Sequence, residues 1–404
     1  MSFQPPKGTD DILAPQSQVW RVALSKWEDW SGRYGYPLVM TPVVEATELF
    51  ERGVGESTEV VTKQMYTFTD KGGRSLTLRP EGTAGVVRAY LNSGHQGPWK
   101  GAYSGPFLRY ERPQAGRRRQ FWQVGVEYLD VESPLADAEV IELAQRYLED
   151  VGVPELELVV NSLGDARCRP AYVEALRGYL RKRASELSEN SVALIDVNPL
   201  RVLDSKIDRP LLGDAPSPVE HLCDACAQHY EAVKAALDRV GIAYVEDPRL
   251  VRGLDYYTRT TFEYIARGLD AAQNAVGGGG RYDGLAEALG GRPVPGVGFA
   301  LGVDRIVLTL GEEEIPHLDA YLVSETGPEE AQVAASQLRD AGLRVDLDSE
   351  GRSVKAQFRA ARRLGAPVIL VWRGQGVPLS VQTTEGQQEM SLEEIPDWIR
   401  GRSA

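Results

Sequence analysis

The chain has 404 residues, 42% of them hydrophobic and 25% charged, with a formal net charge of −13, and this length predicts two or three domains with sizeable cores. The acidic balance argues against broad, nonspecific binding to nucleic acid. Three cysteines are too few for a disulfide framework, and neither a signal-peptide core nor an apolar run of membrane-spanning length occurs, so we expect a cytoplasmic protein without a membrane partner.

The N-terminal part predicts one long helix and short strands. Trp20, Trp27 and Trp30 recur at roughly helical spacing within residues 16–33, which indicates a helix whose aromatic face packs in the core. The run "YPLVMTPVVE" is typical of a strand, and its Pro42 places it at a sheet edge or a bulge. "SLTLRP" predicts a further strand, which leads into a helix at "EGTAGVVRAYL".

Residues 107–121, "FLRYERPQAGRRRQF", carry five arginines and a single acid, Glu111. If two strands flank the loop "PQAGRRR", these arginines converge. Guanidinium groups stay charged, bind phosphate oxygens in pairs and stack on flat rings, so the segment favours a nucleotide or the end of a nucleic acid as ligand. The alternative is a solvated basic hairpin.

Two polar segments indicate a pocket for a ligand with N–H donors. In "QVGVE", Gln123, Gly125 and Glu127 share one face of a strand, because side chains alternate along it. In "RPEGTAG", Glu81 supplies a second carboxylate beside Thr83, at the junction of a strand and a helix. Taken alone, Glu81 also fits the first turn of an ordinary helix.

Helical segments dominate from about residue 165 to 247, which predicts an inserted helical module. Its segment "HLCDACAQHY" contains His221, Cys223, Cys226 and His229. The Cys-x-x-Cys pair is compatible with half of a zinc site, but the short spacing from Cys226 to His229 and the helical pattern favour a packed helix start. Cys168 is far from this pair in the sequence.

Strand-like and glycine-rich sequence returns at residues 248–310, so the insertion interrupts the core domain. "RGLDYYTR" supplies Arg252 with Tyr256 and Tyr257. "GGGGRYDG" either lets the backbone approach a ligand closely or forms a loose hairpin turn. In "GVGFALGVDR", Arg305 falls at the start of a helix.

The last region, from Asp319 onward, alternates strands and helices in the order β-α-β-α-β, which predicts a small, largely parallel α/β domain. Between residues 352 and 363 the sequence has basic residues and no acid. Such a segment gives a local positive field for a nucleic acid, although an ordinary solvated helix face is the alternative.

Three common enzyme classes are excluded. The chain has no Gly-Lys dipeptide for the Walker loop of a nucleoside triphosphatase, no G-x-G-x-x-G of a dinucleotide-binding enzyme and no nucleophile elbow of a triad hydrolase.

The order of the segments resembles class II aminoacyl-tRNA synthetases, and among them the histidyl-tRNA synthetase family. "YPLVMTPVVE" looks like motif 1, "FLRYERPQAGRRRQFWQVGVEYL" like motif 2 and "GVGFALGVDRIVL" like motif 3, with Asp304 where glutamate is usual. "PPKGTDDILAP", "RPEGTAG", "LVRGLDYYTRT" and "GGRYDGL" resemble segments specific to that family.

The resemblance implies an α/β (α+β) fold with an antiparallel class II sheet flanked by helices. It assigns residues 1–165 and 248–315 to a discontinuous catalytic domain, 166–247 to a helical insertion and 319–404 to a small α/β anticodon-binding domain. It also implies a homodimer formed through motif 1. The expected reaction is ATP-dependent activation of L-histidine to histidyl-adenylate, with Mg²⁺ on the phosphates, and transfer to the 3′ end of tRNA(His).

Roles for individual residues follow from the resemblance. The residues expected around histidine are Glu81, Thr83 and Gln123 at the α-ammonium group, Glu127 at the imidazole, and Tyr256 and Tyr257 around the ring. Those expected around ATP are Arg109 and Arg305 at the phosphates, Phe121 and Glu111 at the adenine, Arg252 at the α-phosphate and the substrate carboxylate, and Arg117. Of these, Arg109, Arg252 and Arg305 are expected to be catalytic. Those expected to contact tRNA are Arg118, Arg119, Arg352, Lys355, Arg359, Arg362 and Arg363. The sequence leaves open how Arg117, Arg118 and Arg119 divide between ATP and tRNA.

Two other functions fit parts of this pattern. One is the non-catalytic, synthetase-like regulatory subunit of ATP phosphoribosyltransferase, which shares the core; Arg252 and the domain at 319–404 argue against it. The other is a nucleic-acid-binding module without catalysis. Such a module would not need Glu81, Gln123 and Glu127 to converge on one site, which argues against it.

Overall fold

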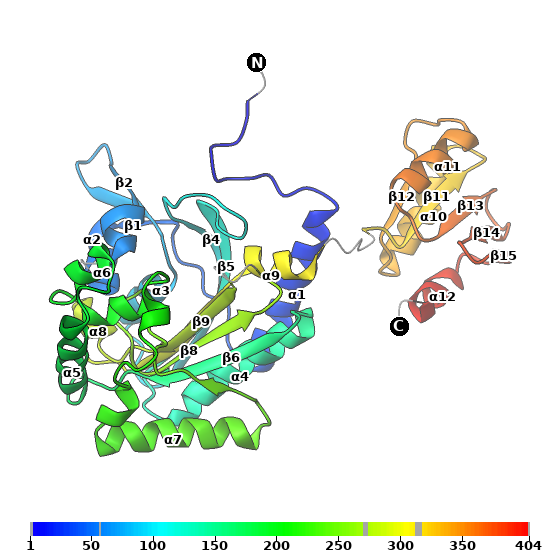
Figure 1. The fold of residues 1–404 in the computed structure, drawn as a ribbon. Helices are drawn as coiled ribbons and strands as arrows, with labels where there is room; N and C mark the ends of the chain where they lie inside the picture. Colours follow the sequence, from blue (N-terminus) through cyan, green and yellow to red (C-terminus); the bar gives the residue numbers. More distant parts are fainter. Residues whose placement is uncertain (1–2, 56–57, 270–273, 312–316, 403–404) are drawn as a thin grey trace. The chain divides into compact units, whose positions relative to one another are not determined.

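A computed structural model describes residues 3–55, 58–269, 274–311 and 317–402 (Figure 1). The domain limits expected at residues 1, 315 and 404 lie outside these ranges. The chain divides into two compact units, one built chiefly from Trp20–Gly311 and the other chiefly from Glu312–Ala404.

The first unit contains a seven-stranded sheet with the order β4-β5-β10-β9-β8-β6-β7. Its strands are β4 (Trp99–Leu108), β5 (Gln120–Leu129), β10 (Gly296–Gly302), β9 (Ala275–Arg281), β8 (Thr258–Ala266), β6 (Leu156–Ser162) and β7 (Val245–Glu246). Neighbouring strands are antiparallel, apart from the short parallel pair β6–β7. The antiparallel core sheet implied by the resemblance is therefore confirmed.

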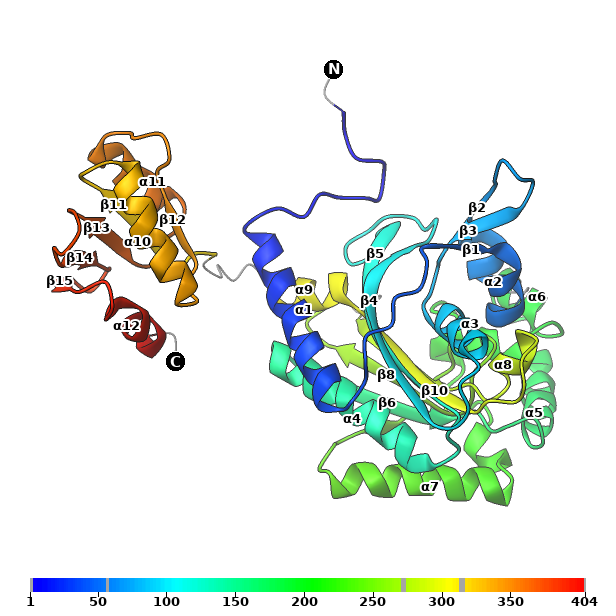
Figure 2. The same ribbon diagram turned by 180° about the vertical axis from the view of Figure 1, so that it is seen from behind.

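The two faces of this sheet differ because large and small side chains alternate along β10. On one face pack α1 (Gln16–Arg33) and α4 (Pro134–Val151), as Figure 2 shows. There the ring of Trp27 lies 5.3 Å from that of Tyr147 and 5.8 Å from that of Phe299. The predicted N-terminal helix is thus present, with its aromatic face in the core. Toward the other face β10 presents only glycine and alanine, which leaves room for a cleft.

A smaller antiparallel sheet, with the order β1-β3-β2, carries part of the motif 1 segment. The remaining elements of this part are β1 (Val44–Ala46), β2 (Tyr66–Thr69), β3 (Ser75–Leu78), α2 (Thr47–Val54), η1 (Val60–Gln64), α3 (Thr83–Ser93), α8 (Leu285–Ala288) and α9 (Val303–Leu310). The strand predicted over "YPLVMTPVVE" is mostly wrong, since only β1 and an isolated bridge from Leu38 to Ala102 pair with other strands. Pro37 and Pro42 each remove a backbone donor from this run.

The segment between β6 and β8 is helical, as predicted. It contains α5 (Arg169–Lys182), α6 (Glu189–Leu194), η2 (Pro199–Asp204), η3 (Arg209–Leu211), η4 (Pro218–His221) and α7 (Asp224–Arg239). α5 and the following turns share an apolar core around Tyr172 and Leu203. α7 instead packs along α4, where His229 Nε2 lies 3.2 Å from Asp137 Oδ1. The run of four glycines lies inside β9, in the middle of the main sheet, and not in a turn.

The second unit is a five-stranded sheet with the order β12-β11-β13-β14-β15. Its elements are β11 (Ala320–Ser324), α10 (Pro328–Asp340), β12 (Val345–Leu347), α11 (Val354–Arg363), β13 (Ile369–Trp372), β14 (Leu379–Gln382), β15 (Gln387–Met390) and α12 (Ile395–Arg402). α10 and α12 pack on one face of β11 and α11 on the other. The expectation of a largely parallel sheet is wrong: β12, β11 and β13 are parallel, but β14 and β15 add an antiparallel hairpin. Every helix in the described ranges is too short or too polar to cross a membrane.

Candidate active site

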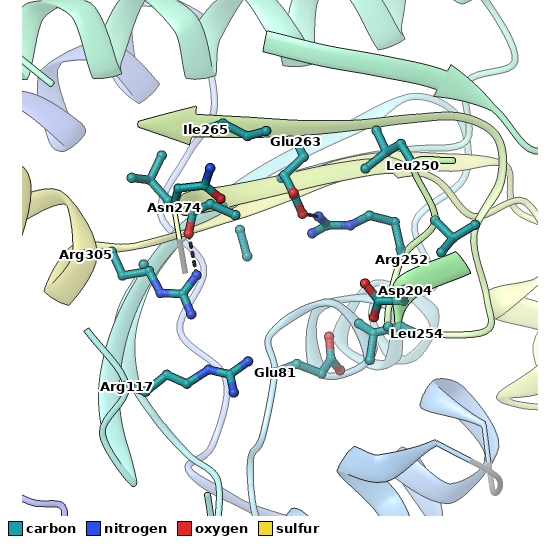
Figure 3. A pocket seen from close by; sticks show the side chains of 18 of the residues that line it. Glu81, Arg117, Asp204, Leu250, Arg252, Leu254, Glu263, Ile265, Asn274 and Arg305 are labelled. Atoms are coloured by element: carbon teal, nitrogen blue, oxygen red, sulfur yellow. Dashed lines mark hydrogen bonds and ion pairs between the residues drawn. The ribbon is translucent and has the colours of Figure 1, made fainter. Parts of the chain in front are cut away.

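A cleft of about 950 Å³ lies over the face of the main sheet that β10 lines with small residues (Figure 3). Its walls come from segments that are far apart in the sequence. The predicted histidine and ATP residues that line it are Glu81, Thr83, Arg109, Glu111, Arg117, Phe121, Gln123, Arg252, Tyr256, Tyr257 and Arg305. The structure therefore gathers into one cavity most of the residues that the sequence marked for a small polar ligand and a polyphosphate.

The floor of the cleft requires glycine because other groups approach the backbone closely. A Cβ atom at Gly278 would lie 2.9 Å from Arg252 Nη1 and 2.4 Å from the carbonyl oxygen of Phe262. A Cβ atom at Gly125 would lie 2.4 Å from the hydroxyl of Tyr103. For the run of four glycines that includes Gly278, the sequence alone left open a close approach or a turn, and the structure shows a close approach.

Glu81 is held at the cleft by the first turn of α3. Its Oε2 accepts a hydrogen bond from the amide of Thr83 (2.7 Å), and its Oε1 accepts one from the amide of Ala84 (2.9 Å). Burial raises the pKa of Glu81, while these N–H groups and the charge of Arg109 oppose the shift. A cationic ligand group beside Glu81 would stabilise its charged form.

Glu127 lies beneath the cleft and does not line it. Its Oε1 accepts a hydrogen bond from Thr83 Oγ1 (2.7 Å), and its Oε2 accepts one from the hydroxyl of Tyr282. Complete burial raises the pKa of Glu127 to about 8. The structure thus places Glu127 one layer behind Thr83. The sequence reasoning missed Tyr282, although it stands in the "GGRYDGL" segment.

Some buried polar atoms of the cleft residues lack a hydrogen-bond partner in the described part of the chain. Gln123 Oε1 and Arg252 Nε are buried without a hydrogen-bond partner. A buried polar group in this state costs free energy unless a ligand or water satisfies it. Gln123 offers an acceptor for a ligand N–H, and Arg252 offers a donor for an anionic oxygen.

Arginines dominate one side of the cavity. Arg109 donates from Nε to the carbonyl of Pro80 (2.8 Å), and its guanidinium carbon lies 5.3 Å from the centre of the Phe121 ring. Arg305 donates from Nε to the carbonyl of Gly116 (3.1 Å). Burial lowers the pKa of both guanidinium groups, which an anionic ligand would offset. Figure 3 shows Arg305 and Arg117 reaching into the cavity opposite Arg252 and Glu81.

Arg252 is positioned by an ion pair that the sequence reasoning missed. Its Nη1 lies 2.6 Å from Glu263 Oε2, and both residues line the cleft (Figure 3). Glu263 is the one acidic residue of strand β8, between Phe262 and Tyr264, and a lone acid between aromatic residues is a signal for a functional partner. Asp204 and Asn274 also line the cavity without having been predicted. Asp204 belongs to the helical insertion, so this module supplies part of the wall.

The three consecutive arginines of the β4–β5 loop take different positions. Arg117 and Arg118 line the cleft, where Arg117 pairs with Glu111 (3.2 Å) and Arg118 with Asp304 (3.3 Å). Arg119 lies outside the lining and stacks over the ring of Tyr110 at 3.8 Å. Asp304, where the motif usually has glutamate, also accepts a hydrogen bond from the amide of Trp122 (2.7 Å).

The basic residues predicted for tRNA in the last domain differ in their freedom. Lys355, Arg359 and Arg362 are exposed on α11 at positions that share one helix face. Arg363 is exposed as well. Arg352 lies ahead of the helix and pairs with Asp348.

The cysteine segment begins the helix α7, and Cys226 is buried in its first turn. Neither histidine joins the cysteines. The ring of His221 lies 5.8 Å from that of Tyr172, and His229 contacts Asp137. Cys168, which is distant in the sequence, lies beside Cys223 and Cys226.

Comparison with known proteins bears on the whole chain. A family described as histidyl-tRNA synthetase matches residues 8–306, and an anticodon binding domain matches residues 306–402. The histidine–tRNA ligase of Mycolicibacterium vanbaalenii is 49% identical over 384 residues, which are 92% of this chain and 90% of that protein. The histidine–tRNA ligase of Desulforudis audaxviator is 48% identical over 382 residues, 92% of this chain and 91% of that protein. A crystal structure of apo S. aureus histidyl-tRNA synthetase has a TM-score of 0.76 at 36% identity, and the match covers 99% of this chain and 100% of that one.

Proposed function

The chain belongs to the histidyl-tRNA synthetase family, and on this premise we propose that the cleft activates histidine with ATP before the amino acid is attached to tRNA. The protein is an aminoacyl-tRNA synthetase that charges tRNA with histidine. The observation that carries the proposal is the convergence of Glu81, Arg109 and Arg252 on one cavity.

The acidic end of the cleft suits histidine. Glu81 and the unpartnered Gln123 Oε1 are acceptors for the α-ammonium group, and Thr83 presents its hydroxyl beside them. Tyr256 and Tyr257 line the same cavity, and their ring centres lie 4.7 Å apart with the planes tilted by 46°, so the two rings can form a wall around an aromatic ligand. Glu127 holds Thr83 and Tyr282 from below, and through them it orients the donors and acceptors that the imidazole meets. A buried polar site of this kind strongly rejects analogues that lack the matching groups.

The basic end suits a triphosphate. Arg109, Arg117 and Arg305 would bind phosphate oxygens, while Phe121 and Glu111 would contact the adenine. Arg252 would bridge the α-phosphate and the carboxylate of histidine. A carboxylate oxygen then attacks the α-phosphorus, the bond to the bridging oxygen of the β-phosphate breaks, and pyrophosphate leaves with the electron pair. Such a step depends mainly on positioning and on stabilisation of charge.

Magnesium fits this site chiefly as a partner of the phosphates. Glu111, Glu263 and Asp304 each already pair with an arginine, so the cleft offers few free carboxylates to a cation. Mg²⁺ commonly binds through substrate phosphates together with one or two carboxylates. When bound, it would neutralise charge on the phosphate oxygens.

The second half-reaction, the transfer of histidine to tRNA, would use residues of both units. The 3′-terminal hydroxyl of tRNA(His) attacks the carbonyl carbon of the adenylate, and AMP leaves. Arg118, at the mouth of the cleft, would contact the acceptor end, and Arg119 would support the same loop from outside. The exposed basic face of α11 would contact the anticodon region, in keeping with the match of this unit to an anticodon binding domain.

Histidine-dependent exchange between ATP and radiolabelled pyrophosphate tests the proposal. We expect exchange with L-histidine and a loss of at least a hundredfold in Arg252→Ala, because the α-phosphate then lacks its guanidinium partner. A folded wild-type protein that catalyses no exchange would instead support the regulatory subunit. Exchange driven by a different amino acid would overturn the assignment of the histidine pocket.

A further inference from the structure

Three cysteines and one carboxylate meet at the base of the helical insertion, away from the residues that line the cleft. The sulfur atoms of Cys168, Cys223 and Cys226 and a carboxylate oxygen of Asp165 all lie within 4.8 Å of one another. Cys168 and Cys226 are buried, Cys223 and Asp165 are partly buried, and all three thiols are free. We propose that these four side chains form a structural zinc site.

The spacing of the donors matches the way proteins build such sites. Asp165 and Cys168 form one pair with two residues between them, and Cys223 and Cys226 form a second pair with the same spacing. Cys168 stands at the N-cap position of α5 and Cys223 at that of α7, and neither side chain makes a capping hydrogen bond. A tetrahedral zinc ion with bonds of about 2.3 Å to sulfur separates its ligand atoms by about 3.8 Å. A contraction of at most about 1 Å would bring the four donors to that geometry.

The charges around the donors suit a thiolate-rich metal centre. Three thiolates and a carboxylate around Zn²⁺ leave two negative charges. Two guanidinium groups face this charge, since Arg167 Nη2 lies 2.8 Å and Arg259 Nη2 3.3 Å from Asp165 Oδ2. Both guanidinium groups contact Oδ2, and the amide of Arg167 donates to Oδ1 at 3.0 Å, so Asp165 is held in place as metal ligands usually are.

The backbone also comes close to the sulfurs. Gly164 has a φ of +66°, and a Cβ atom there would lie 2.6 Å from Cys168 Sγ. Purely apolar packing would explain one buried cysteine. It does not explain three sulfur atoms and a carboxylate oxygen gathered within 4.8 Å of one another.

A metal at this position would brace the active site. The loop that carries Asp165 is hydrogen-bonded to the start of β8, because the amide of Arg259 donates to the carbonyl of Gly164 at 2.8 Å. Arg169, in the first turn of α5, donates to the carbonyl of Tyr257, which lines the cleft. The ion would therefore join α5, α7 and the loop of Tyr257 at one point.

Metal analysis of the full-length protein tests the proposal. The protein is purified from zinc-supplemented cells and dialysed extensively. We then expect about one zinc ion per chain, measured by elemental mass spectrometry. Cys168→Ser and the double variant Cys223→Ser/Cys226→Ser should fall below about a tenth of that content. The matched control is His221→Ala, which removes a neighbouring potential ligand outside the cluster and should keep the zinc.

Cobalt substitution tests the site in the wild-type protein, so its main result does not depend on whether a cysteine variant folds. Wild-type protein stripped of metal and loaded with Co²⁺ should show the visible absorption of tetrahedral thiolate coordination, and Asp165→Asn should shift that spectrum. Wild-type protein that retains no zinc and gives no thiolate spectrum with cobalt would overturn the proposal. A Cys223–Cys226 disulfide in freshly purified protein, or loss of zinc in His221→Ala, would overturn it equally.

Discussion

At the scale of single residues, the two buried carboxylates of the site have different roles. Glu81 accepts hydrogen bonds from two amide N–H groups of α3. It lines the cleft, so it can bind a cationic group of a ligand. Glu127 accepts hydrogen bonds from the hydroxyl groups of Thr83 and Tyr282, and it lies behind the residues that line the cleft. Hydroxyl donors only partly offset the burial of Glu127, so its pKa rises to about 8 and its charge changes in the neutral pH range.

Glu127→Gln tests this difference. The pKa of Glu127 is about 8 in the folded chain, against about 4.3 in an unfolded one. Between these values the native state holds a proton that the unfolded state has lost, so the stability of the wild type should fall as pH rises from about 5 to 8. The neutral glutamine should flatten this part of the curve, which thermal unfolding of the ligand-free protein between pH 5 and 9 would show. In the exposed control Glu132→Gln the slope should remain, and an unchanged slope in Glu127→Gln would refute the protonated carboxyl.

At the scale of secondary structure, β9 is unusual because it is both central in the sheet and rich in glycine. It is a central strand, paired with β8 and β10, yet its middle consists of glycine, which weakens strands. The packing explains the exception, because neighbouring backbone and Arg252 occupy the space in which side chains would lie.

Gly278→Ala should therefore cost both stability and activity. The added Cβ atom meets the carbonyl of Phe262 and the guanidinium of Arg252, and overpacking of this kind typically costs about 1–3 kcal/mol. We expect a lower thermal midpoint and a fall in kcat for pyrophosphate exchange of at least tenfold, because Arg252 is displaced. Gly284→Ala is the matched control, since a Cβ atom there meets nothing within 4 Å. Equal activity of the two variants would show that the floor tolerates a side chain.

Local sequence patterns predict the elements of this fold better than the partners of its site residues. Periodicity located α1, and the motif 2 hairpin was predicted as two strands around a basic loop, because both patterns are local. The partners of site residues were harder to find. Glu263 reaches Arg252 only through the pairing of β8 in the sheet, and Cys168 reaches Cys223 only through the fold of the insertion. Glu127 was placed on the correct strand, but depth below a surface is a property of packing that strand alternation does not reveal.

At the scale of the whole molecule, the motif 1 segment leaves an apolar surface uncovered. Leu38 is 67% exposed, Met40 84%, and Val43 and Val44 about 40% each. Exposed apolar side chains are ordinary when scattered, but four within seven residues form a patch of the kind that marks an interface. This patch is consistent with the homodimer through motif 1 that the resemblance implies.

Met40→Asp should dissociate that dimer. A carboxylate placed at the most exposed of these positions would be buried in an apolar contact, where it has no partner. Sedimentation analysis at micromolar concentration should give a dimer for the wild type and a monomer for the variant. Val333→Asp, which alters an equally apolar exposed residue on α10, should remain dimeric. A monomeric wild type, or a dimeric Met40→Asp variant, would exclude this interface.

The division into two units predicts that the two half-reactions can be separated. The cleft residues belong to the first unit, and the free basic face of α11 belongs to the second. Replacing Lys355, Arg359 and Arg362 together by glutamine should leave histidine-dependent pyrophosphate exchange unchanged. It should raise the KM for tRNA(His) at least tenfold and reduce the slope of log affinity against log salt by about 2–3, since each lost phosphate contact removes about 0.7–0.9.

Arg400→Gln, which removes an exposed cation already paired with Asp397, is the control and should change neither quantity. If the triple variant binds tRNA with the wild-type salt dependence, the basic face of α11 is a solvated surface and the tRNA contacts of this unit lie elsewhere. If it loses exchange as well, the two units are coupled in the activation step, and the cleft does not act on its own.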